Sequence, residues 1–192
     1  KNRMIFKVHE LDKNSEKFNF FLLHGVNEGH KEEIINKFKE LYEENIFKYY
    51  EKEIFSNINV FYDQILSKSF FENKKLIIIK DATDKLKNEI EILKEKKLSD
   101  IKIICVSNIL DKRSKLRNLF EKEKDFISVA FYADTNQTLT AITKKFFNEK
   151  KIAISQESIN LIVNRANGER KSLSNELKKI ESYVIGKNKI SI

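Results

Sequence analysis

Five short apolar runs, rich in β-branched and aromatic residues, divide the first 134 residues of the chain into alternating strand and helix signals. The segments between the runs carry apolar residues at helical spacing. Two of the middle runs, LIIIK and IKIICVS, are continuously apolar, as in strands that are covered on both faces. The pattern predicts an α/β fold, a parallel sheet with helices on both faces. The expected strands lie at residues 18–23, 46–55, 76–79, 101–106 and 126–131.

The strand signal stops at Thr135, and three amphipathic segments follow. Their apolar residues recur at helical spacing, which predicts a small bundle of three helices. We place the boundary after Asp134, with an α/β domain at residues 1–134 and a helical domain at residues 135–192. The helical positions are Leu139, Ile142, Phe146 and Phe147, then Ile159, Leu161, Ile162 and Val163, then Leu173, Leu177, Ile180 and Val184.

The positive charge of the chain is concentrated in the predicted helical domain. The net charge is +8, and residues 135–192 contain 11 Lys and Arg against 5 Glu, a net charge of +6. Such a segment fits contact with nucleic acid or an acidic protein, and also an ordinary solvated helix surface. No apolar stretch approaches the ~18 residues of a membrane span, and the first residues lack the apolar block of a signal peptide. We therefore expect a cytoplasmic protein without membrane contact.

The cysteine and histidine residues, the usual ligands of zinc, are too few and too far apart to form a recognisable site. Cys105 is the only cysteine and lies in the run IKIICV, where a buried core thiol is expected. His9, His24 and His30 have no Cys or His at zinc-ligand spacing. We predict neither a metal nor another cofactor.

The stretch FLLHGVNEGHKEEIINKF has the strand, turn and helix of a phosphate-binding loop but not its chemistry. Such a loop requires G-x-x-x-x-G-K-[ST], in which backbone N–H groups and the lysine bind phosphate and the hydroxyl binds Mg²⁺. With Gly25 as the first glycine, Lys31 takes the lysine position. However, His30 replaces the second glycine and Glu32 replaces the hydroxyl, with Glu33 following. We expect Gly25, Lys31 and Glu32 to mark a degenerate site that does not bind nucleotide.

A second requirement of a P-loop ATPase fails at the end of the apolar run at residues 76–79. An active enzyme needs an acid for Mg²⁺ and a second acid to orient water. Here Asp81 is followed by Ala82, so Asp81 is expected to be a strand-end or helix-capping residue. Asn108 lies where a polar side chain could sense a phosphate, but a role in the turn is favoured. The sequence therefore predicts no intact catalytic site.

Two adjacent phenylalanines follow a predicted helix at residues 56–69, SNINVFYDQILSKS, which Ser56 or Asn57 would cap. If this helix continued, Phe70 and Phe71 would project roughly 100° or more away from its apolar face. They would then form an exposed knob that could fill a pocket of a partner. Alternatively, the helix ends at Ser69 and the pair turns inward to cap the sheet. The pattern alone leaves both interpretations open.

Taken together, these features resemble the delta subunit of bacterial DNA polymerase III, a clamp-loader subunit with an AAA+-like fold. The resemblance covers almost the whole chain. It is carried by LLHGVNEGHKEE, by SFFENKKLIIIKDA, by ICVSNILDKRSKL, and by the helical segment with ANGERKSLSNELKKIESY. No single motif is sharp, but their order and spacing are fairly specific.

The resemblance implies a function that the composition and spacing do not show. Members of the family do not hydrolyse ATP and act by binding and opening the sliding clamp, the beta subunit, during DNA replication. The clamp-binding pair matches Phe70 and Phe71, preceded by Ser69, which favours the exposed knob. Other clamp-loader subunits, and primer–template DNA reached through the complex, are the further partners implied. The family also has a third, helical collar domain, which we expect to be absent here because the sequence ends at Ile192.

Two other functions remain as alternatives. A divergent P-loop enzyme would use Lys31 and Asp81 to bind a nucleotide with Mg²⁺, although Glu32 and Ala82 argue against it. A DNA-binding module would use the basic helices at residues 135–192. This second alternative lacks the interleaved aromatic residues of a base-stacking surface.

Overall fold

The computed structural model describes Val8, Leu11, Leu98 and residues 17–42, 45–67, 74–96 and 100–184. The predicted clamp-binding residues Ser69, Phe70 and Phe71 lie outside these ranges. The described residues form two compact units. Unit 1 comprises those within residues 1–26 and 33–131, and unit 2 those within 27–32 and 132–192. The two units do not coincide with the predicted domains, because unit 2 also includes the first turn of helix α2, at residues 27–32. The domain boundary that we placed after Asp134 therefore stays a prediction.

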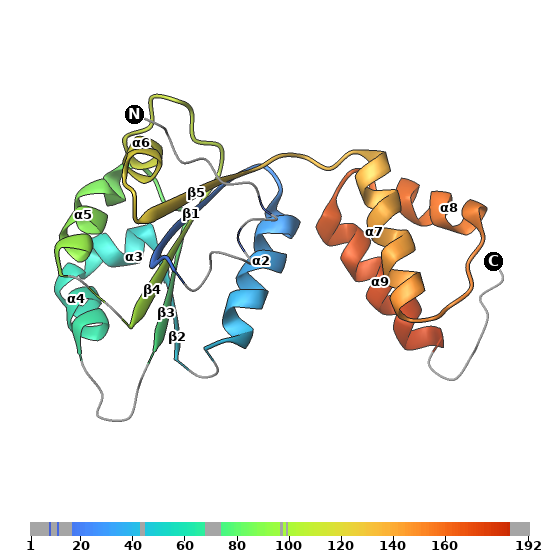
Figure 1. Cartoon of the computed structure of the whole chain (residues 1–192), viewed down its shortest axis with the longest axis horizontal. Helices are drawn as coiled ribbons and strands as arrows, with labels where there is room; N and C mark the ends of the chain where they lie inside the picture. Colours follow the sequence, from blue (N-terminus) through green and yellow to red (C-terminus); the bar gives the residue numbers. More distant parts are fainter. Residues whose placement is uncertain are drawn as a thin grey trace. The chain divides into compact units, whose positions relative to one another are not determined.

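Unit 1 is built on a five-stranded sheet in which every strand is parallel to its neighbours, in the order β2-β3-β4-β1-β5 (Figure 1). Each run that was predicted to be a strand contributes one strand. Because all the strands run the same way, their carboxyl ends meet at one edge of the sheet. The strands are β1 (Phe20–Gly25), β2 (Ile46–Tyr50), β3 (Lys75–Lys80), β4 (Ile101–Ser107) and β5 (Phe126–Phe131).

Both faces of the sheet are covered, as the continuously apolar runs predicted. Alternate residues of β1 enter different cores: Phe20 lies in one with the helices of one face, and Phe21 in the other with helix α2. Helix α2 (Glu28–Glu40) covers one face, and the other helices of unit 1 whose bounds the structure gives cover the other face (Figure 1). These are α3 (Glu51–Ser56), α4 (Ile58–Leu66), the 3-10 helix η1 (Asp84–Leu86), α5 (Lys87–Glu95) and α6 (Lys115–Lys122).

Two boundaries in the first half of the chain differ from the prediction. The run at residues 46–55 is not one strand, because β2 ends at Tyr50 and α3 begins at Glu51. The backbone N–H of Tyr50 donates to the Glu53 carboxylate at 2.9 Å, an interaction typical of a helix start. The helix predicted at residues 56–69 is shorter as well, since α4 ends at Leu66.

Unit 2 contains the three predicted helices, α7 (Asn136–Glu149), α8 (Gln156–Ala166) and α9 (Arg170–Val184). Their apolar faces form a separate core that includes Leu139, Phe147 and Leu173. The hydroxyl of Thr135 caps α7, and α8 ends at Asn167 in a left-handed conformation, a common way to close a helix. Among the helices that the structure describes, none is long and apolar enough to cross a membrane.

Candidate functional site

The turn after β1 requires glycine for a structural reason. Gly25 has φ 123°, and its N–H donates to the carbonyl oxygen of Asn108 at 3.1 Å. A Cβ atom added here would lie 2.3 Å from the carbonyl oxygen of Phe131. Only glycine tolerates both the positive φ and this close approach. The position of Gly25 is therefore explained by the sheet, and the backbone carbonyl of Asn108 takes part in this turn.

Asn27 begins helix α2 and was not singled out by the sequence analysis. Its side-chain oxygen accepts the backbone N–H of His30 at 3.0 Å, which is the interaction of an N-cap residue. Its amide nitrogen donates to the carbonyl oxygen of Tyr132 at 3.0 Å and to the carboxylate of Asp134 at 2.8 Å. An asparagine directly before a segment of helical period is a signal that could have identified this cap.

Lys31, in the position of a phosphate-binding lysine, is buried and paired within its own helix. Its side chain is 1% exposed, and its Nζ lies 2.6 Å from the carboxylate of Glu28. Glu32, in place of the hydroxyl, forms an ion pair with Lys171 at 3.2 Å. A phosphate at the first turn of α2 would therefore meet two carboxylates, and it would compete with Glu28 for the charge of Lys31.

A buried ion pair lies beside this first turn, within unit 2. Arg170 donates to the two carboxylate oxygens of Asp134 at 2.8 Å and 2.6 Å, with side-chain exposures of 8% for Arg170 and 4% for Asp134. Burial by itself would raise the pKa of Asp134. The hydrogen bonds from Arg170 and Asn27, with the charges of Arg170 and His30, outweigh burial and lower that pKa. Asp134 is therefore held as a carboxylate.

Gly29 allows the first turns of α2 and α9 to come together around this ion pair. A Cβ atom on Gly29 would lie 2.6 Å from the backbone nitrogen of Lys171 and 3.1 Å from the Cβ of Arg170. Two helix N-termini that meet in this way bring together their partial positive charges. The Asp134 carboxylate offsets these charges and that of Arg170. The negative charge that the two helix N-termini and Arg170 favour is thus the carboxylate of Asp134, a part of the protein, rather than that of a bound anion.

Asp81 directly follows β3 and is not part of the Asp134–Arg170 ion pair. It is exposed and adopts a left-handed conformation with φ 56°, so its expected place at a strand end is confirmed. The alternative capping role is wrong, because Thr83 caps the following helix η1. Thr83 is in turn held by the buried carboxylate of Glu51, which accepts its N–H at 2.6 Å and its hydroxyl at 2.8 Å.

No group of three or more His, Cys, Asp or Glu side chains within the described ranges could hold a metal ion. Cys105 is buried in the core as predicted. Burial raises the pKa of its thiol, and the charge of Glu51 adds to this. The thiol is therefore unsuited to act as a nucleophile or a metal ligand.

The structure fixes both ends of the segment that contains the predicted clamp-binding residues. Before the segment, α4 ends at Leu66 with Ser67 as its cap. After it, the buried Lys75 begins β3 and donates through Nζ to the carbonyl oxygens of Ser67 at 2.7 Å and Gln64 at 3.2 Å. A cation is favourable at a helix carboxyl end. Lys75 thus ties the end of α4 to the start of β3, and residues 68–73 connect these two points.

The fold of the chain is similar to that of several solved structures. The chain superposes on the Bacillus subtilis DNA clamp loader delta protein (YqeN) with TM-score 0.66 and 15% identity, covering 95% of this chain and 58% of that one. It also superposes on the Thermotoga maritima RuvB Holliday junction branch migration motor, with TM-score 0.54 and 14% identity over 96% of this chain and 62% of that one. Superposition on domain III of the Thermotoga maritima replication initiation protein DnaA gives a TM-score of 0.50 and 15% identity, covering 95% of this chain and 84% of that one.

In sequence, no family model and no curated protein matches the chain. The chain spans 58% of the length of the clamp loader delta protein. At these identities the likeness concerns the fold. The chain has the α/β fold with a parallel sheet and a following helical bundle that its sequence predicted, and its resemblance to a clamp-loader delta protein is confirmed at the level of the fold.

Proposed function

We propose that the chain is a non-ATPase clamp-loader subunit of DNA polymerase III, which binds and opens the sliding clamp during DNA replication. The observation that carries the proposal is the likeness of the fold to a DNA clamp loader delta protein; in the sequence of this chain, Phe70 and Phe71 stand between α4 and β3. They belong to the segment whose two ends Lys75 holds together. Lys75 is thus an anchor for the two described ends between which the proposed clamp-binding residues stand in the sequence.

Binding to the clamp would favour opening through a difference in affinity. Phe70 and Phe71 would enter an apolar groove of the clamp, as aromatic anchors commonly do in protein interfaces. A partner that binds the open ring more tightly than the closed ring shifts the population toward the open ring. The rigid sheet of unit 1 would hold the ring in that state.

The proposed subunit would not itself hydrolyse ATP. Lys31 is paired with Glu28, Glu32 with Lys171, and Ala82 follows Asp81 where a second acid is required. These contacts support the absence of a working site. ATP bound to other clamp-loader subunits would then supply the energy of the cycle, in the cytoplasm, with primer–template DNA held by the assembled complex.

The proposal is tested by calorimetric titration of the chain into a sliding clamp from the same source, without nucleotide. A Phe70→Ala/Phe71→Ala double variant should lose at least ~2 kcal/mol of binding free energy, as expected for a hot-spot pair. A matched control is Ile92→Ala/Leu161→Ala, which removes two exposed apolar side chains elsewhere and should bind like the parent. Equal loss in both double variants, or no binding by the parent chain, would refute the proposal.

A further inference from the structure

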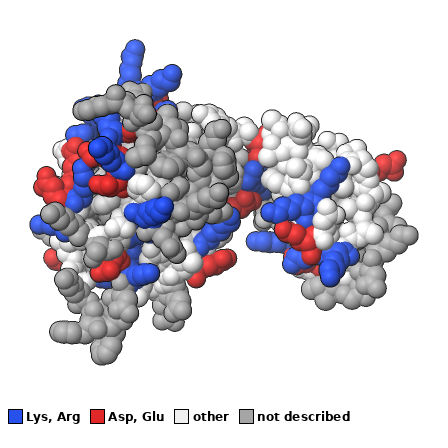
Figure 2. All heavy atoms as spheres, in the orientation of Figure 1, with Lys and Arg blue, Asp and Glu red and all other residues white. Residues whose placement is uncertain are grey.

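The loop between β4 and α6, together with the first residue of α6, presents three cations that the proposed clamp interaction does not use. Lys112, Arg113 and Lys115 are all exposed, and none of them forms an ion pair with another described residue. Figure 2 shows Lys and Arg side chains projecting over this loop at the top of unit 1. By contrast, the nearby Arg117 and Lys94 are paired with carboxylates at 2.6 Å and 2.5 Å. The turn at residues 111–115 thus has three cations against the one carboxylate of Asp111, and none of the three is in an ion pair with a described residue.

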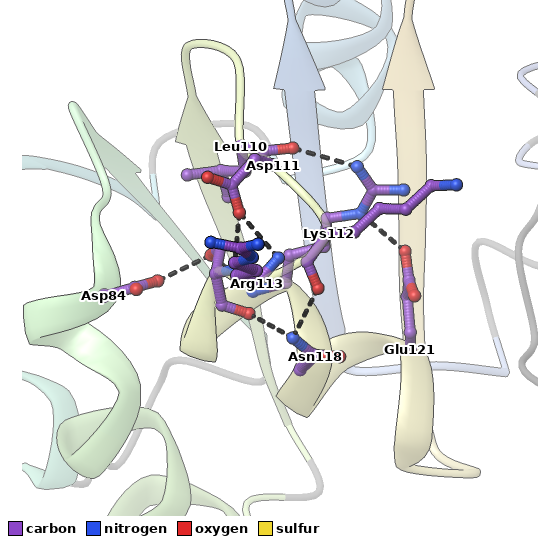
Figure 3. A network of polar contacts seen from close by, with 9 residues as sticks. Asp84, Leu110, Asp111, Lys112, Arg113, Asn118 and Glu121 are labelled. Atoms are coloured by element: carbon purple, nitrogen blue, oxygen red, sulfur yellow. Dashed lines mark hydrogen bonds and ion pairs between the residues drawn. The ribbon is translucent and has the colours of Figure 1, made fainter.

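Hydrogen bonds hold the backbone of this loop in one conformation (Figure 3). One carboxylate oxygen of Asp111 accepts the N–H groups of Arg113 at 2.6 Å and Ser114 at 3.1 Å. The amide of Asn118 donates to the carbonyl oxygens of Lys112 at 2.9 Å and Ser114 at 2.7 Å. The positions from which the cations project are therefore fixed before any ligand binds.

The acidic residues near the loop are occupied by these internal contacts. Asp84 accepts the hydroxyl of Ser114 at 2.6 Å and the N–H of Leu116 at 3.0 Å. Burial alone would raise the pKa of Asp84, but these bonds, a backbone hydrogen bond from Lys115 and the charge of Lys115 lower it. Both Asp84 and Asp111 thus shape the loop, and neither forms an ion pair with its cations.

We propose that the turn at residues 111–115 is a preformed binding site for the phosphate groups of a nucleic-acid backbone. Lysine and arginine side chains provide most of the charge that proteins direct at phosphates, and adjacent positions can reach successive phosphates. An acidic protein surface is the less suitable partner, because protein interfaces need apolar or aromatic anchors. Within the loop and turn at residues 108–115, Ile109 is the one large apolar side chain that is strongly exposed. The site is separate from clamp binding and does not depend on it.

The test measures binding of the chain to a fluorescent DNA duplex with a single-stranded overhang, by anisotropy at several salt concentrations. The triple variant Lys112→Ala/Arg113→Ala/Lys115→Ala should bind on the order of 10²-fold more weakly at 0.1 M salt, because each phosphate contact contributes about 0.9 to the salt slope. The slope itself should fall by about 2 to 3. The control, Lys52→Ala/Lys122→Ala/Lys124→Ala, removes three exposed lysines of unit 1 that are in no ion pair among described residues, and should have a much smaller effect.

A pair of Asp111 variants distinguishes a shaped site from general attraction. Asp111→Ala removes the acceptor that holds the N–H groups of Arg113 and Ser114. It should weaken DNA binding severalfold even though it makes the chain more positive. Asp111→Asn keeps an acceptor oxygen and should bind at least as tightly as the parent chain. Tighter binding by Asp111→Ala would refute the shaped site.

Three other outcomes would overturn the proposal. They are no DNA binding by the parent chain, equal losses in the two triple variants, and binding of a polyglutamate peptide with the same dependence on the three cations in place of DNA. The last result would assign the turn to an acidic protein surface. Circular dichroism of each variant verifies that its fold is unchanged.

Discussion

Removing the carboxylate of Asp134 should destabilise unit 2 by about 3–5 kcal/mol, the usual cost of leaving one partner of a buried ion pair alone. The magnitude follows from the contacts. Arg170 makes two hydrogen bonds to Asp134, at 2.8 Å and 2.6 Å, and Asn27 makes a third at 2.8 Å. In Asp134→Ala, the Arg170 guanidinium stays buried without its counter-charge, beside two helix N-termini that repel it.

Hydrogen exchange of the backbone amides in α2 and α9 measures this loss locally, which avoids assuming that the whole chain unfolds in one step. A double variant, Asp134→Leu/Arg170→Met, should recover much of the stability, because apolar residues of similar size can replace a buried ion pair. The partly exposed pair Lys150–Glu181 is the control, and Glu181→Ala should cost about 0–1 kcal/mol. A cost for Asp134→Ala as small as that of Glu181→Ala would refute the reasoning.

The pH dependence of the same contact has a definite sign. The folded-state pKa of Asp134 is lowered below the ordinary value of 3.8. Its contribution to stability is therefore fully present above pH 3.8 and is lost as the pH falls through the lower, folded-state pKa. The difference in stability between the parent chain and Asp134→Ala should thus shrink only below pH 3.8. A difference that disappears between pH 5 and 7 would contradict this assignment.

Three further predictions concern single residues, two at the turn that resembles a phosphate-binding loop and one in the core. Gly25→Ala should lower stability by at least ~1–3 kcal/mol in denaturant unfolding, because of its positive φ and the contact with Phe131; a change below ~0.5 kcal/mol would count against it. Lys31→Met should leave ATP affinity unchanged and very weak in equilibrium dialysis, whereas a loss of measurable, Mg²⁺-dependent binding would restore the enzyme alternative. Cys105 should react with a thiol reagent far more slowly in the folded chain than in denaturant, since burial raises the pKa of its thiol.

Most of the fold follows from local patterns in the sequence. Runs such as LIIIK and IKIICVS have too many consecutive apolar residues for a half-exposed strand, and they form the central strands β3 and β4. The error at residues 46–55 has a local cause. Ile54 and Phe55 favour strands by composition, but Glu53 accepts the N–H of Tyr50 and starts a helix.

The candidate site could be predicted only in part. The replacement of phosphate-binding chemistry at Lys31 and Glu32 is visible in the sequence, because it depends on residues in one short turn. The pairing of Asp134 with Arg170 is not visible, because the two residues lie 36 positions apart and no local periodicity relates them. The hydrogen-bonded turn at Asp111 falls between these cases: the motif was noted, but its contact with Asp84 appears only in the folded chain.

The central claim is that this chain opens a sliding clamp by binding it, without hydrolysing ATP. The most direct measurement is the rate at which labelled clamp leaves closed circular DNA when the chain is added in the absence of nucleotide. The account predicts that the parent chain accelerates release and that Phe70→Ala/Phe71→Ala does not, although both are folded. Release that stays at the spontaneous rate with the parent chain bound, or that requires ATP bound by this chain, would contradict it.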